Sequence, residues 1–211
     1  IINFGQDSSF AGNKTAQGNQ DSNEIGDFYY TPPTDFLALC TANLPGVTAG
    51  LWDSGVNKHF NTILYDDGAG AKTGVGFQPD FVWLKARGST NEHELTDAVR
   101  GVTKALSSDS DNAESTDSTG LTAFGADGFT VGADTDYCDT TGDGMVAWCW
   151  KAGNETLGTG DFTQGTIAST CSRNVDAGFS IVSYTGTGSA ATVGHGLSSA
   201  PEFIVVKNRG N

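Results

Sequence analysis

Apolar and polar residues alternate along several short stretches of this chain, and glycine-rich turns separate the stretches. The alternation is clearest at residues 60–65, while residues 145–150 are apolar on both faces. A period of two is typical of a half-buried strand, and a short doubly apolar run is typical of a central strand in a sandwich. We therefore predict an all-β fold of β-sandwich modules in tandem, with glycine-rich turns and little helix. Further strands are predicted at residues 1–4, 28–30, 36–40, 81–85, 129–131, 179–184 and 203–209.

One stretch also has the spacing of a helix. Between Leu95 and Leu106 the apolar residues recur every three to four positions, which favours a short helix. Gly101 and the β-branched residues around it disfavour that helix. The sequence leaves the choice between helical and non-helical structure open here.

Nearly the same sequence motif, called the repeated line below, occurs twice in the chain. The sequence FNTILY at residues 60–65 is echoed by FSIVSY at 179–184, and GFQPDFVWLKARG at 76–88 is echoed by GLSSAPEFIVVKNRG at 196–210. Self-similarity on this scale is the mark of tandem modules, and small changes in loop length between copies cost little. We predict that the two copies superpose strand on strand.

These patterns divide the chain into five parts. Strands in residues 1–45 precede a linker at 46–55, which begins with the glycine of a Pro-Gly pair. Residues 56–153 form the first complete repeat module, and residues 154–174, which contain few apolar side chains, form a second linker. Residues 175–211 are the beginning of a second copy. Because the chain starts at isoleucine, we expect an interior fragment or a processed product.

Charge narrows the choice of partners. The 211 residues include 25 acidic and 11 basic side chains, which gives a net charge of -14. Nucleic acids and anionic membranes bind basic surfaces, so neither is expected as a partner. No apolar run approaches the roughly 18 residues of a membrane span. The 12 Phe, 5 Tyr and 4 Trp residues are too many for a disordered chain.

Four cysteines, Cys40, Cys138, Cys149 and Cys171, have the spacing of neither a redox pair nor a zinc site. Cys149 lies in an apolar strand, where a buried thiol acts as a small apolar side chain. Disulfides depend on the compartment, and the sequence leaves their state open.

Two segments resemble proteins of known context. Residues 3–45, NFGQDSSF…GDFYYTPPTDFLALCTANLP, resemble the closing strands of SPRY-type concanavalin-like sandwiches in tail-fibre and other virion proteins of marine bacteriophages. The series FNTILY…GVGFQPDFVWLKAR…DAVRG…GLTAFGADGFTVG…GDGMVAWCWKAG resembles the uncharacterised repeat that follows that sandwich, often in tandem. The resemblance implies a structural role in a virion, which is assembled in the bacterial cytoplasm and exposes the protein on its outside. It brings no catalytic chemistry with it.

Asp134, Asp136, Asp139 and Asp143 are the candidate metal ligands. Hard oxygen ligands crowded into a glycine-bearing loop suit calcium. Their spacing is not that of an EF-hand, and no glutamate closes the loop as a bidentate ligand. The alternative is an exposed turn stabilised by aspartate side chains that bind the backbone. Apart from possible calcium, no cofactor is expected.

Lys85, Arg87, Lys207 and Arg209 are matched basic pairs at the ends of the two repeated lines. In so acidic a chain we predict that at least one pair contacts carboxylates of a neighbouring module or subunit. The alternative is that these side chains face water at strand ends.

We expect a non-enzymatic structural component of a phage particle, such as a tail fibre, spike or surface decoration. It would form homo-oligomers, bind other virion proteins and contact a host-surface glycan. A carbohydrate-binding adhesin is the first alternative, and exposed aromatic side chains beside acidic loops would favour it. A polysaccharide-degrading enzyme is the second, and it requires two carboxyl groups at catalytic separation in a cleft. No motif singles out a catalytic residue.

Overall fold

The computed structural model describes residues 7–38, 43, 58–66, 68–138, 142–158, 160–161 and 165–210. The chain divides into two compact units, Ile1–Gly55 and Val56–Asn211. No described residue lies in an α-helix, which confirms the all-β fold class.

Side chains that bind the backbone organise the first unit. The Asp21 carboxylate accepts a hydrogen bond of 2.8 Å from the amide of Ala38, and the Asn19 side chain donates to the carbonyl of Phe28. Such bonds occupy backbone groups that a strand ladder would otherwise use. Irregular structure therefore takes the place of extended strands in the described part of this unit.

Two strand predictions are corrected as a result. Among the described residues, 28–30 contain only a single bridge at Phe28, and residues 36–38 form no strand. The predicted strand at 1–4 and the predicted linker at 46–55 lie outside the described residues.

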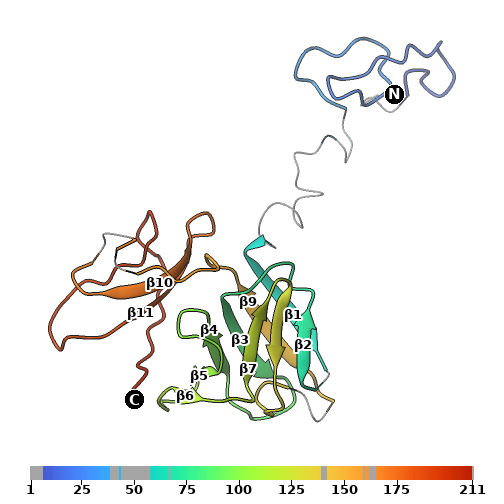
Figure 1. The fold of residues 1–211 in the computed structure, drawn as a ribbon. Helices are drawn as coiled ribbons and strands as arrows, with labels where there is room; N and C mark the ends of the chain where they lie inside the picture. Colours follow the sequence, from blue (N-terminus) through green and yellow to red (C-terminus); the bar gives the residue numbers. More distant parts are fainter. Residues whose placement is uncertain are drawn as a thin grey trace. The chain divides into compact units, whose positions relative to one another are not determined.

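The second unit is a two-layer β-sandwich with an additional two-stranded sheet (Figure 1). One layer is antiparallel with the order β1-β9-β3-β4-β5-β6, and the other has the order β2-β8-β7. β10 and β11 pair with each other. The strands are β1 (Phe60–Tyr65), β2 (Gly70–Thr73), β3 (Phe81–Ala86), β4 (Glu94–Asp97), β5 (Lys104–Ser107), β6 (Ser115–Thr116), β7 (Leu121–Gly125), β8 (Gly128–Val131), β9 (Met145–Trp150), β10 (Ser169–Asn174) and β11 (Phe179–Tyr184).

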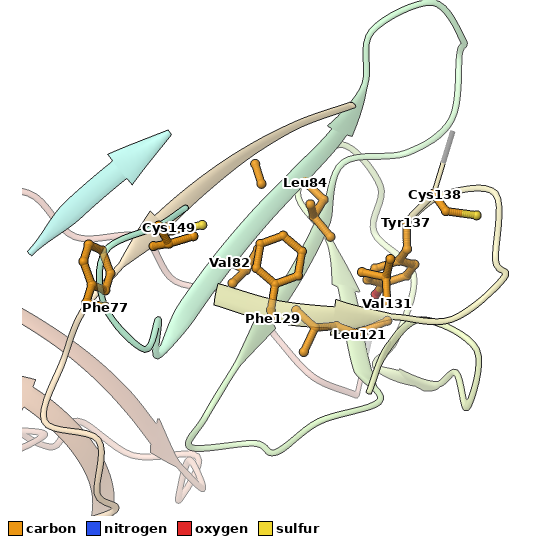
Figure 2. Packing of buried hydrophobic residues seen from close by; sticks show 12 residues of the cluster. Phe77, Val82, Leu84, Leu121, Phe129, Val131, Tyr137, Cys138 and Cys149 are labelled. Atoms are coloured by element: carbon orange, nitrogen blue, oxygen red, sulfur yellow. The ribbon is translucent and has the colours of Figure 1, made fainter. Parts of the chain in front are cut away.

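The core lies between the two layers (Figure 2). Alternate residues of β3 and β9 point into it, and side chains of β7 and β8 meet them from the opposite layer. This is the burial that a period of two predicts. The strand residues that form the centre of the core are Val82, Leu84, Leu121, Phe129, Val131, Ala147 and Cys149.

An aromatic cluster covers the other face of the large sheet. The Trp150 ring lies 4.9 Å from the ring of Phe60 and 5.2 Å from that of Phe81, measured between centroids. Phe179, the first residue of β11, stacks on Trp150 at 6.2 Å. Aromatic pairs of this kind add to the stabilisation from burial. The cluster therefore attaches the β10–β11 sheet to the large one.

The ambiguous stretch is a strand, a turn and a second strand. β4 and β5 pair in antiparallel register, and the Asp97 carboxylate accepts the amides of Val99 and Arg100 in the turn between them. Thr103 adopts a φ of 64°, which a helix excludes. Of the apolar residues with helical spacing, Leu95 and Leu106 are buried strand residues, whereas Val99 and Val102 lie in the turn and are not buried.

The two copies repeat one local contact. In the first copy the Asn61 side chain donates to the carbonyl of Val75 at 3.0 Å. In the second copy Ser180 occupies the position of Asn61, and its hydroxyl donates to the carbonyl of His195 at 2.6 Å. His195 is the counterpart of Val75. The predicted strand at residues 179–184 is confirmed as β11.

Two other predictions for this region are wrong. Residues 203–209 form no strand, because the strands that flank β3 in the first copy have no counterpart among the described residues of the second. Residues 154–174 are not only a linker, since they end in β10. β10 pairs through its backbone and buries Ser169, Cys171 and Ser172, so an apolar count does not detect it.

Leu84→Ala should lower the free energy of unfolding by about 2–5 kcal/mol, because it leaves a cavity in the core. Leu84 is fully buried, whereas Leu64 on β1 is 65% exposed. Leu64→Ala is therefore the matched control, with an expected loss of about 0.5 kcal/mol. Urea denaturation followed by tryptophan fluorescence measures both values, and equal losses would contradict the assignment of this core.

Candidate functional site

An acidic cavity of about 360 Å³ lies between β4, β5, β6 and the turn that follows β8. No lysine or arginine lines it. Polar lining of one charge is typical of sites that hold protons or cations. The carboxyl groups in the lining belong to Glu92, Glu94, Asp117, Asp134 and Asp136.

Glu94 is the most buried of these carboxyl groups. It is the first residue of β4, and only 6% of it is exposed. Tyr137 donates its hydroxyl to Glu94 Oε2 at 3.1 Å, and Ser107 on β5 donates to Oε1 at 3.3 Å. The Ser107 hydroxyl also contacts Glu92. Both oxygens of Glu94 are therefore bound by hydroxyl groups of the chain itself.

Tyr137 connects the cavity to the edge of the large sheet. Its side chain is almost fully buried, and its carbonyl accepts a hydrogen bond of 2.6 Å from the hydroxyl of Tyr65 on β1. The Tyr137 hydroxyl contacts Glu94 at the other side. One residue thus fixes the turn after β8 to two strands.

The environment of the cavity favours protonated carboxyl groups. Burial raises the pKa of Glu94 to about 7, with further contributions from the charges of Asp136 and Glu92, while the hydrogen bonds from Tyr137 and Ser107 oppose the rise. Burial and the neighbouring charge of Asp134 also raise the pKa of Asp136. Glu94 therefore exchanges its proton near neutral pH, where such a group can act as a general acid.

Three of the four predicted calcium ligands are among the described residues, and two of these three line the cavity. Asp134 and Asp136 line the cavity, and Asp134 Oδ1 accepts the amide of Asp136 at 2.8 Å, which is a side-chain-stabilised turn. Asp143 lies against Gly88, and Asp139 is outside the described residues. No group of three or more potential ligands in the described part of the chain is arranged to hold a metal ion. Calcium binding stays a prediction.

The basic pair of the second copy contacts the first module. Arg209 donates to both oxygens of Glu114, at 2.9 and 2.8 Å, and Lys207 donates to the carbonyl of Ser110. Glu114 also pairs with Arg100 at 3.3 Å. The hydrogen bonds from Arg209 are the main cause of the lowered pKa of Glu114. The loop of residues 110–114 thus binds the end of the second copy.

The basic pair of the first copy has local contacts. Lys85 donates to the carbonyls of Ala86 and Ser89, both at 2.9 Å. The amide of Arg87 donates to the carbonyl of Gly144 at 2.9 Å, at the start of β9. These contacts lie within one module, so the two basic pairs differ in their surroundings.

The cysteines contribute buried thiols. Cys149 and Cys171 are free and fully buried, while Cys40 lies outside the described residues. Burial raises the pKa of the Cys149 thiol to about 12. At neutral pH this thiol stays protonated and is a poor nucleophile.

One feature of the sequence indicates the acidic cavity, namely the spacing of two glutamates. Glu92 and Glu94 are two residues apart, so in an extended chain both side chains point to one face. Asp80 was missed as well. It is fully buried, and its carboxylate accepts the amide of Ala152 at 2.7 Å and contacts the hydroxyl of Ser172. Burial raises its pKa.

A family model described as Domain of unknown function (DUF7483) matches residues 55–211. The chain belongs to this family. The DUF7483 domain coincides with the second compact unit, so it contains the acidic cavity and both copies of the repeated line. No curated protein and no solved structure matches the chain.

The described residues also contain no helix of the length and apolarity that a membrane span requires.

Glu94→Gln should remove a pH dependence of stability. The raised pKa means that the folded state holds the proton more tightly than the unfolded state, so the free energy of unfolding falls as pH rises from 4.5 to about 7. We expect the free energy of unfolding of the unsubstituted protein, relative to that of the variant, to fall by about 2 kcal/mol over this interval. Urea denaturation at several pH values measures it. Glu155→Gln, an exposed site, is the control, and parallel profiles for all three proteins would contradict the assignment.

Arg209→Ala should lower the free energy of unfolding by only about 0–1 kcal/mol, because half of the arginine side chain is exposed. A double-mutant cycle with Glu114→Gln isolates the pair. We expect a coupling energy that decreases in high salt, measured by urea denaturation. Strict additivity of the two changes at low salt would show that the pair adds nothing.

Proposed function

We propose that the chain is a non-enzymatic structural component of a phage particle, namely a tail fibre, spike or surface decoration that serves assembly and host-surface attachment. One observation supports this most directly: the four apolar side chains from Phe203 to Val206 are 67% to 83% exposed. A contiguous apolar patch on a soluble surface marks a site of association with other proteins. Homo-oligomers and other virion proteins are the partners of such a component, and the virion is its location.

The acidic cavity suits a structural role too. A catalytic acid has to reach the atom that it protonates. Both oxygens of Glu94 instead bind Ser107 and Tyr137, and through Tyr137 they hold the turn after β8 against the sheet. The main contribution of this carboxyl group is therefore to the shape of the module.

A polysaccharide-degrading enzyme is the second candidate, and Glu94 is the observation that favours it. Its pKa of about 7 is in the range of a general acid, and it shares the Ser107 hydroxyl with Glu92, so two carboxyl groups lie close together. Release of reducing sugars from host polysaccharides, lost in Glu94→Gln and in Glu92→Gln, would favour the enzyme over the structural component.

Mass spectrometry of purified particles tests the structural role. We expect several copies of the chain per particle and labelling of the particle surface by an antiserum against residues 55–211. Deletion of the gene should remove the labelled structure, and expression of the chain in the host should restore it. Complete particles without the chain, which is then found only in the soluble lysate, would refute the proposal. Glycan-array binding by the isolated chain would point to the adhesin.

A further inference from the structure

Residues 112–117, called the wall segment below, lie between the acidic cavity and the contact with the second copy. The odd-numbered residues of this segment line the cavity. The carboxylate of Glu114, which lies between them in the sequence, instead binds Arg100 and Arg209. Alternate residues of an extended chain point to opposite sides. One side of the wall segment therefore faces the cavity, and the other side holds the second copy.

The second copy is bound to the wall segment by backbone and side-chain groups. The amide of Glu114 donates to the carbonyl of Arg209 at 2.9 Å, and the Arg209 guanidinium binds both oxygens of the Glu114 carboxylate. Arg209 also donates to the Ser183 hydroxyl on β11 at 3.2 Å. The position of the wall segment therefore determines how the end of the second copy is held against the first module.

The wall segment is joined to the sheet by a short ladder. It contains β6, a strand of two exposed residues at the edge of the large sheet (Figure 1). β6 pairs with β5 at two positions, and the Asp117 amide donates to the carbonyl of Thr103 at 2.9 Å. On the other side of the cavity, Tyr137 binds both Glu94 and Tyr65. Because local stability follows the number of buried contacts, the wall segment is the side of the cavity that opens at the lower cost.

Titratable groups from three parts of the cavity lining face Glu94. They are Glu92, Asp117, Asp134, Asp136 and Tyr137. Burial raises the pKa of Tyr137, so its hydroxyl stays neutral. The ammonium of Lys85 on β3 donates to two backbone carbonyls and lies outside the cavity lining. Ionisation of Glu94 therefore adds a negative charge among carboxylates, and like charges in a partly buried site repel each other.

We propose that the proton on Glu94 controls the contact between the two copies: the wall segment holds residues 207–209 while Glu94 is protonated and releases them when Glu94 ionises. In the open state the wall segment moves away from the other carboxylates, and water hydrates Glu94. The aromatic cluster around Trp150 does not include the wall segment, so β11 stays attached to the first module. The inference goes beyond a structural role in a particle and concerns how one repeat is held on the next.

The direction of the effect follows from burial. In the closed state the pKa of Glu94 is about 7, and exposure to water in the open state returns it toward the ordinary 4.5. The closed state thus binds the proton more tightly and is favoured at low pH. It loses this advantage as pH rises from 4.5 to about 7. Above that range both states are ionised, and the balance between them no longer changes with pH.

Hydrogen exchange of the full chain, followed by NMR between about pH 5 and about pH 8, tests the proposal. The protection factor of the Glu114 amide, which is corrected for the intrinsic pH dependence of exchange, reports opening of the contact. We expect it to fall about tenfold over this range. It should not fall in Glu94→Gln, whose side chain carries no charge, and Glu155→Gln should behave as the unsubstituted protein.

Two further measurements separate opening of the wall segment from unfolding of the module. Exchange at Glu114 should be independent of low urea concentrations, because a local opening exposes little surface. The Thr166 amide, which donates to Thr192 outside the cavity lining, should keep its protection as pH rises. If Glu94→Gln does not fold, Glu92→Gln takes its place. Loss of that facing charge should move the fall in Glu114 protection to lower pH.

Linkage provides a reciprocal test. If protonation of Glu94 favours the contact, the contact must favour protonation of Glu94 by the same factor. Arg209→Ala should therefore lower the titration midpoint of the Glu94 carboxyl group, measured by carbon NMR, by about 0.5 pH units. Arg173→Ala is the matched control and should leave the midpoint unchanged, because Arg173 donates to the carbonyl of Gly196 within the second copy.

Four results would overturn the proposal. They are Glu114 protection that is constant with pH, an equal fall in Glu94→Gln, exchange at Glu114 that accelerates with urea as global unfolding does, and an unchanged Glu94 midpoint in Arg209→Ala. The assays contain no particle, so their failure leaves the virion role to its own test.

Discussion

β9 is the strand on which the second unit depends, because it pairs with β1 along one edge and with β3 along the other. Its two faces serve different parts of the molecule. Met145, Ala147 and Cys149 are fully buried in the core, while Trp150 organises the aromatic cluster that Phe179 joins. The packing of the two layers and the attachment of the β10–β11 sheet therefore start from the same six residues.

Buried carboxyl groups hold the loops in place through hydrogen bonds. Asp80 binds the backbone after β9 and the Ser172 hydroxyl on β10, and Glu94 binds the hydroxyl of Tyr137. Burial raises the pKa of both groups. A buried polar group is costly unless it is hydrogen-bonded, so each carboxyl group fixes the position of the groups that satisfy it. Directional bonds therefore hold the loops of the module in addition to its apolar core.

Local patterns predicted some of the strands but not their partners. Residues 60–65 were predicted as a strand because burial of alternate side chains leaves a period of two in the sequence, and residues 145–150 because a central strand is apolar on both faces. β10 left no such trace, since serines are buried there and the backbone makes the pairing. The pairing of β1 with β9, and the cavity that Glu94 shares with Tyr137, depend on contacts between residues far apart in the chain. The local sequence pattern alone does not determine which strands pair or in which register.

The position of β9 also has a consequence for synthesis. β1 and β3 leave the ribosome early, and residues 87–144 must follow before their common partner exists. Such distant pairing is slow, because closing the intervening chain costs entropy before any contact forms. In repeat proteins, exchange of strands between similar modules is a characteristic misfolding event. The copies differ at positions that pair with β9 in the first copy, where Asn61 and Trp83 correspond to Ser180 and Val205 in the second. Because of this divergence, a newly synthesised β9 pairs preferentially with the strands of its own module.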